Sequence, residues 1–108
     1  MPTLRSSQKQ GDQGIVQLEG ELTEGPSLDS LEGWLEEHFV DDGVRTIRVD
    51  VSRVTRIDLE GVAALGLLAA EAINRHKVLF VEGASGQPLS KLKEAGLLRY
   101  LEKRERPG

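Results

Sequence analysis

One segment constrains the fold more than any other, because it is apolar almost all the way round: Gly61 to Ile73, with the sequence GVAALGLLAAEAI. Its alanine and glycine content is typical of a helix that packs closely onto a sheet and is covered by neighbouring elements. The segment is too short to cross a bilayer, which takes about 20 apolar residues. The sequence therefore predicts a helix within a globular domain, covered on nearly every side.

Four segments around this helix have the patterns of β-strands. Ile15–Leu22 follows a turn and contains β-branched and alternating residues, and Thr3–Lys9 can either pair with it as a hairpin or fray at the chain end. Val44–Val51 alternates apolar and polar residues, as a strand with one buried face does. Lys77–Val81 is an uninterrupted apolar run bounded by Gly83, which predicts an inner strand.

Two further helices are predicted. After Gly25 and Pro26, apolar residues recur at intervals of three and four and define one helical face: Leu28, Leu31, Trp34, Leu35, His38 and Phe39. Pro88–Ala95 forms a short helix followed by Gly96, a residue suited to the position after a helix end. The order is β-β-α-β-α-β-α, which predicts an α/β fold with a mixed, mostly parallel sheet packed against helices.

The length of 108 residues fits one domain over residues 1–108, with an ordered core from about residue 14 to residue 101 and flexible termini. The chain has no cysteine, so it has neither a disulfide framework nor a thiolate metal site. Its N-terminus lacks the apolar core of a signal peptide, and no apolar run is long enough to span a bilayer. We therefore expect a soluble cytoplasmic protein without direct membrane insertion.

The net charge of −4 hides a division along the chain. Gly11 to Val44 contains ten acidic residues and no Lys or Arg, whereas Arg45 to Gly108 contains twelve basic and eight acidic residues. This asymmetry fits either a surface that orients a partner or two solvated faces of opposite sign. Binding to nucleic acid is not expected, because the basic residues lack interleaved aromatic residues.

The residues that usually carry catalysis do not form a recognisable site. His38 and His76 have no metal-ligand spacing, and Ser85 lacks the Gly-x-Ser-x-Gly context of a hydrolase nucleophile. The turn Gly83–Gly86 lacks both the Lys-Ser/Thr ending of a P-loop and a Gly-x-Gly-x-x-Gly pattern, so an ordinary turn explains it. The sequence predicts no enzyme, no metal site and no cofactor.

Two carboxylates mark the start of the apolar helix. Asp58 can accept a backbone N–H as the capping residue, and Glu60 places negative charge at the positive end of the helix dipole. Each effect is typically worth about 0.3–2 kcal/mol, so structure alone can account for both residues.

The segment from Val49 to Ile73 resembles the central signature of STAS domains, the family named for sulfate transporters and anti-sigma factor antagonists. Asp50–Val54 is similar to the strand ending Asp-Leu-Ser-x-Val, and Ile57–Val62 to the Ile/Met-Asp-Ser-Ser-Gly-Leu that opens the following helix. Leu18–Leu22 resembles the family's Leu-x-Gly-x-Leu strand, and Leu92–Leu97 its terminal Leu-x-x-x-Gly-Leu. The resemblance implies a single STAS-like domain.

The resemblance also implies a site and a departure from it. In anti-sigma factor antagonists the second serine of Asp-Ser-Ser-Gly is phosphorylated by a partner kinase, and here Glu60 occupies that phosphosite position and Leu59 the preceding one. Glu60 would imitate a phosphoserine permanently but imperfectly, because a phosphoserine carries about −1.5 to −2 charges and three acceptor oxygens.

The implied partner-binding residues are Asp58, Leu59, Glu60, Gly61 and Val62. Leu59 would either be an exposed anchor or pack under the first turn.

Three functions remain open. The first is a non-enzymatic module that resembles an anti-sigma factor antagonist and binds a kinase-like anti-sigma factor, with no phosphorylation at Glu60 and with Ser52 or Thr55 as alternative phosphosites. The second is a cytoplasmic accessory subunit of a membrane transporter, of anion or lipid ABC type, which would have to dock because the chain begins with Met1 and has no membrane span. The third is nucleotide binding at Asp58 and the Gly83–Gly86 turn, where carboxylates would repel phosphate.

Overall fold

The computed structural model describes residues 2–23, 27–94 and 96, which form a four-stranded sheet and three helices. Their order along the chain is β-β-α-β-α-β-α, so the predicted α/β class and element order are confirmed. The elements are β1 (Pro2–Gln10), β2 (Gln13–Leu22), α1 (Ser27–Val40), β3 (Thr46–Ile57), α2 (Leu59–Asn74), β4 (Val78–Glu82) and α3 (Gly86–Glu94). The predicted C-terminal tail lies outside the described residues.

The strands lie in the order β1-β2-β3-β4. The first pair is antiparallel, so Thr3–Lys9 does form the hairpin, and the other two pairs are parallel. The prediction of an inner strand at Lys77–Val81 is wrong, because β4 lies at an edge of the described sheet. Its apolar run reflects packing on one face and partial cover of the other, since Leu79 and Val81 are buried while Phe80 is half buried.

Strand β3 is longer than the sequence pattern predicted, and ends at Ile57 instead of Val51. Two register shifts in its pairing with β2 change the spacing of its buried residues from two to three, at Val51, Val54 and Ile57. Alternation is therefore lost while pairing continues, and the periodic signal for a strand fails. The extra length carries β3 directly to the start of α2.

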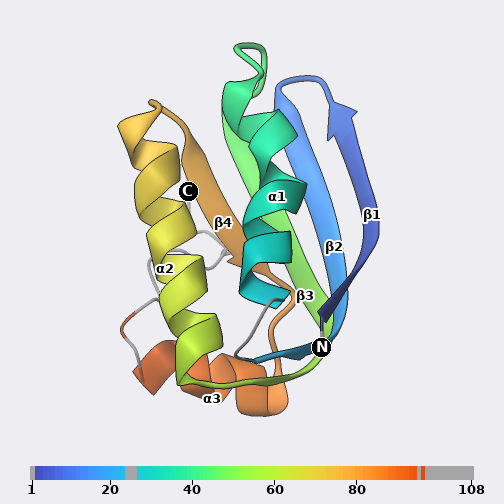
Figure 1. The fold of residues 1–108 in the computed structure, drawn as a ribbon, viewed down its shortest axis with the longest axis vertical. Coiled ribbons are helices and arrows are strands. Elements are labelled where there is room, and N and C mark those ends of the chain that lie inside the picture. Colours follow the sequence, from blue (N-terminus) through green and yellow to red (C-terminus); the bar gives the residue numbers. More distant parts are fainter. Residues whose placement is uncertain (1, 24–26, 95, 97–108) are drawn as a thin grey trace, which may run out of the picture.

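Helices α1 and α2 lie over the same face of the sheet, and α3 lies across one end of it (Figure 1). The buried side chains of β2, of β4 and of β3 as far as Val51 alternate with half-buried or exposed ones, so one face of each strand supplies the core. The largest fully buried side chains are Leu18, Leu22, Leu31, Leu35, Ile47, Ile57, Leu65, Leu79 and Leu92.

The opposite face of the sheet carries polar pairs that span neighbouring strands. Arg48 on β3 forms an ion pair of 2.9 Å with Glu82 on β4. Gln17 on β2 accepts a hydrogen bond from Ser6 on β1 and donates one to Asp50 on β3. Cross-strand pairs of this kind suit a half-solvated sheet face.

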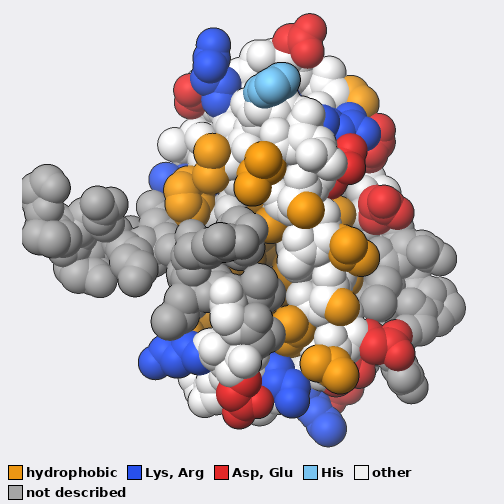
Figure 2. Space-filling model, turned by 90° about the vertical axis from the view of Figure 1, so that its left-hand side faces the viewer, with side chains coloured by type: hydrophobic (Ala, Val, Ile, Leu, Met, Phe, Trp, Pro, Cys, Tyr) orange, Lys and Arg blue, Asp and Glu red, His pale blue; other side chains and the backbone are white. Residues whose placement is uncertain are grey.

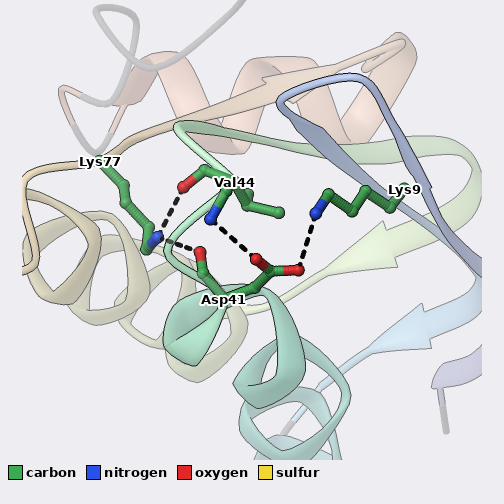
Figure 3. A network of polar contacts seen from close by, with 5 residues as sticks. Lys9, Asp41, Val44 and Lys77 are labelled. Carbon is green, nitrogen blue, oxygen red and sulfur yellow. Dashed lines mark hydrogen bonds and ion pairs between the residues drawn. The ribbon is translucent and has the colours of Figure 1, made fainter.

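A second polar network closes the loop between α1 and β3, at the end of the sheet where β3 and β4 begin (Figure 3). Lys77 is only 7% exposed, and its ammonium donates to the carbonyl oxygens of Asp41 and Val44. The Asp41 carboxylate accepts from the Gly43 N–H at 2.8 Å and from the Lys9 ammonium at 3.1 Å. A buried lysine is tolerated here because two carbonyl oxygens accept hydrogen bonds from its ammonium.

The donors around Asp41 hold the pKa of its carboxyl below the ordinary value of 3.8, the Gly43 N–H having the largest effect and the Lys9 ammonium the next. A depressed pKa in the folded state means stability that is present above the unfolded pKa and lost as the pH falls through the folded pKa. We expect wild type to be more stable than Asp41→Asn near neutral pH, and the difference to vanish in acid. Chemical denaturation over a pH series measures it, and a difference that persisted in acid would contradict this assignment.

Candidate functional site

The candidate site lies where β3 passes into α2. Strands β2, β3 and β4 are parallel, so their carboxyl ends meet at one edge of the sheet, and α2 begins at that edge beside α3 (Figure 1). Only Asp58 separates the last residue of β3 from the first residue of α2. In open α/β sheets this edge is the usual location of functional sites.

Asp58 caps α2 as predicted. Its backbone is extended, with φ −103° and ψ −176°, and its carboxylate Oδ1 accepts the Gly61 N–H at 2.8 Å. Its own N–H donates to the carbonyl oxygen of Leu22, at the end of β2, over 3.4 Å. The cap therefore ties the first turn of the helix to two strands, and such a cap is typically worth about 1 kcal/mol.

Gly61 and Val62 lie under the first turn of α2 and face the core. Gly61 is buried, and a Cβ at this position would overlap the carbonyl oxygen of Leu22. Val62 is 5% exposed. The helix can approach the end of β2 this closely only because residue 61 has no side chain.

Leu59 and Glu60 are the two residues of the predicted set that point outward. Leu59 is 72% exposed, so of the two predicted placements the structure shows the exposed one. Glu60 is also exposed and lies in the first turn, where its negative charge interacts favourably with the positive end of the helix dipole. Asp58, which lies between the end of β3 and Leu59, is half buried.

Gln87 also belongs to the junction between β3 and α2, although no sequence pattern indicated it. Its side-chain amide lies against the last residue of β3, donating to the Ile57 carbonyl oxygen and accepting the Ile57 N–H, each at 2.9 Å. A residue of α3 thus satisfies both backbone groups of Ile57, which lie at the end of the β3 strand. No local pattern signals such a contact, because the two residues are 30 positions apart.

The other hydroxyl and glycine candidates lie near the same edge of the sheet. Ser52 and Thr55 are exposed on the extended part of β3. The Ser52 N–H donates to the Asp50 carboxylate at 2.9 Å, and the Thr55 hydroxyl donates to the Gly20 carbonyl oxygen at 3.3 Å. Gly83 has a φ of +80° and packs against Asp50 and Ser52, which explains a glycine at this turn.

The two histidines lie apart from this site. His38 is 3% exposed on α1, and its Nε2 is 2.9 Å from the Ser7 hydroxyl of β1. His76 is exposed in the turn between α2 and β4. Among residues 2–23, 27–94 and 96, no cluster of three or more His, Asp or Glu side chains has the geometry to hold a metal ion. Within the same residues, no helix is long and apolar enough to cross a membrane.

Comparison with protein families matches residues 6–102 to a STAS family described as "Mlab, STAS domain". The match covers most of the chain, so the protein belongs to the STAS domain family. This confirms the resemblance carried by the segments around Asp50–Val54 and Ile57–Val62. Comparison with curated proteins finds no match.

Solved structures show the same fold. The anti-sigma factor antagonist SpoIIAA in its unphosphorylated form is 16% identical, with a TM-score of 0.76 over 94% of this chain and 86% of that one. The murine solute carrier 26 family member A9 anion transporter is 20% identical, with a TM-score of 0.73, and the match covers 85% of this chain but 15% of the transporter. A sulfate transporter family protein from Wolinella succinogenes is 24% identical, with a TM-score of 0.67 over 82% of this chain and 70% of that one.

The close approach at Gly61 yields a stability test. Gly61→Ala should lower the free energy of unfolding by about 1–3 kcal/mol, because the added methyl group overlaps the Leu22 carbonyl oxygen. Gly33→Ala is the matched control, since Gly33 lies in α1 with open space at its Cβ position and should gain about 0.5–1 kcal/mol. Chemical denaturation of both variants measures the two changes. Equal effects would show that the contact between α2 and β2 is not tight.

Proposed function

We propose that this protein is a non-enzymatic STAS module that binds another protein in the cytoplasm through the start of α2. The first of two candidate roles is that of a regulator of the anti-sigma factor antagonist kind, with a kinase-like anti-sigma factor as its partner. Similarity of fold to SpoIIAA supports the class, and the departure at Glu60 defines how this member would differ. Asp58, Gly61 and Val62 position the surface, and Leu59 and Glu60 form its contacting part.

The observation that carries this proposal is the pairing of an exposed Leu59 with a rigidly held helix start. An exposed leucine on the first turn contributes little to the stability of the isolated chain, whereas in an interface it can fill a pocket of the partner. The turn that presents it is fixed by the Asp58 cap and by the contact of Gly61 with β2. A preorganised turn loses little conformational entropy when it binds.

Glu60 makes the charge at this surface permanent. A carboxylate supplies one negative charge where a phosphoserine supplies about −1.5 to −2, and it has no hydroxyl to accept a phosphoryl group. The module would therefore act as constitutively modified, with weakened affinity for an anti-sigma factor. Ser52 and Thr55 are exposed and stay as candidate sites for a separate modification.

A second function has its own support. The matching family is described by the name Mlab, and domains of two transporter proteins share the fold. In this alternative the protein is an accessory subunit that docks on the cytoplasmic side of an anion or lipid ABC transporter. Glu60 would then serve mainly as a charge that stabilises the helix start.

Affinity capture from the native cytoplasm and membranes, with wild type, Glu60→Ser and Leu59→Ser as baits, distinguishes the two functions. Recovery of a kinase-like anti-sigma factor, held more tightly by Glu60→Ser, is the expected result. Glu37→Ser is the matched control, since Glu37 is exposed on α1 away from the site. Transporter subunits recovered equally by wild type and Glu60→Ser would support the alternative. Partners retained in full by Leu59→Ser would contradict the proposed surface.

A further inference from the structure

Helix α2 exposes a long apolar face, although its sequence predicted cover on nearly every side. Leu59 and Leu67 are each 72% exposed and Ile73 is 57% exposed. Ala63 and Ala70 are exposed between them. Figure 2, which shows the side of the molecule that carries α2, has hydrophobic side chains in a column down this face. Solitary exposed leucines are common on proteins, whereas a continuous apolar face usually marks an interaction site.

Charge is confined to the two ends of this face. No charged residue occurs in α2 between Glu60 and Glu71. Glu60 lies in the first turn, while Arg75 follows the last turn and is held there by an ion pair of 2.6 Å with Glu71 and by its position over the Phe39 ring. The face therefore begins with a carboxylate, continues as an uncharged apolar stretch and finishes near the Glu71–Arg75 ion pair.

The exposed residues also repeat symmetrically about the middle of the helix. Residues seven positions apart lie on nearly the same side of a helix, and the face contains three such rows. Ala63 and Ala70 form the central row, with an outer row on each side: Leu59, Gly66 and Ile73 on one, and Glu60, Leu67 and Asn74 on the other. All three rows are centred within half a residue of the point between residues 66 and 67, so the face can match itself when turned end to end.

We propose that a second copy of this chain covers the face, through antiparallel packing of the two α2 helices about a two-fold axis near residues 66 and 67. Leu67 then meets Leu67 of the second copy, and Leu59 lies against Ile73 of the second copy at both ends. The small central residues Ala63 and Ala70 face each other and let the helices approach closely. Isologous pairing of this kind is the commonest arrangement of homodimers.

The charges at the ends favour this occupant. Antiparallel packing places Glu60 of each copy opposite the neutral Asn74 and near the Glu71–Arg75 ion pair of the other, and it aligns the positive end of each helix dipole with the negative end of its neighbour. A parallel arrangement would bring the two Glu60 carboxylates together. One helix pair buries less than the roughly 800 Å² per partner of a standard interface, so the dimer should be weak and depend on concentration.

Self-association would occupy Leu59 and Glu60, and so would compete with any partner at the start of α2. This competition rests on the proposed function, whereas the dimer does not. Loss of partner binding by a variant that still dimerises, or the reverse, would therefore separate the two proposals.

Sedimentation equilibrium of the full chain over a wide concentration range tests the dimer. Wild type should fit a monomer–dimer equilibrium, and Leu67→Glu should weaken it about tenfold or more by placing two carboxylates at the two-fold axis. Val40→Glu is the control, because Val40 is 59% exposed at the end of α1 and lies off this face. A wild type that stays monomeric, or a dimer that Leu67→Glu leaves intact, would overturn the proposal.

Disulfide trapping tests the antiparallel arrangement, and the chain has no cysteine to interfere. Leu67→Cys should form a linked dimer under mild oxidation, because residue 67 of each copy lies at the axis. Ile73→Cys should not, since antiparallel packing separates the two copies of residue 73 by about 20 Å along the helices. Equal trapping of both variants would contradict the arrangement.

Discussion

The contact between Gly61 and the carbonyl oxygen of Leu22 sets the position of α2, and much of the site depends on it. A side chain at residue 61 would lift the helix away from the end of β2. The Asp58 cap and the two hydrogen bonds between the Gln87 side chain and the Ile57 backbone then fix the short link between β3 and α2. Because the first turn cannot rotate under these constraints, residues 59 and 60 are directed outward.

The open face of the sheet and the outer face of α2 differ in the side chains that they expose to solvent. The open face of the sheet carries Arg48 paired with Glu82 and Gln17 bonded to Asp50, so these polar groups have partners within the fold. The outer face of α2 has no such pairs between Glu60 and Glu71, and instead exposes leucine, isoleucine and alanine. A surface with this distribution is more suited to protein contact along α2 than over the sheet.

Local patterns predicted much of the fold and part of the site. Element order followed from periodicity and turn residues, and the Asp58 cap from the residue type before an apolar helix. Contacts between distant segments were not predictable: nothing near Gly61 signals Leu22, and nothing near Gln87 signals Ile57. The length of β3 was missed because its register shifts remove the alternation. The prediction that neighbouring elements cover α2 was wrong on one face. The sequence pattern shows that a helix is apolar, but it does not show whether another part of the same chain packs against it.

The central claim is that the fixed start of α2 presents Leu59 to a protein partner. The most direct measurement is calorimetric titration of the partner protein recovered by affinity capture with wild type, Leu59→Ser and Val40→Ser. The free energy of unfolding of each of the three is measured alongside. The account predicts about tenfold or more weaker binding for Leu59→Ser, unchanged binding for Val40→Ser, and similar stability for all three. Equal affinity of wild type and Leu59→Ser would contradict it.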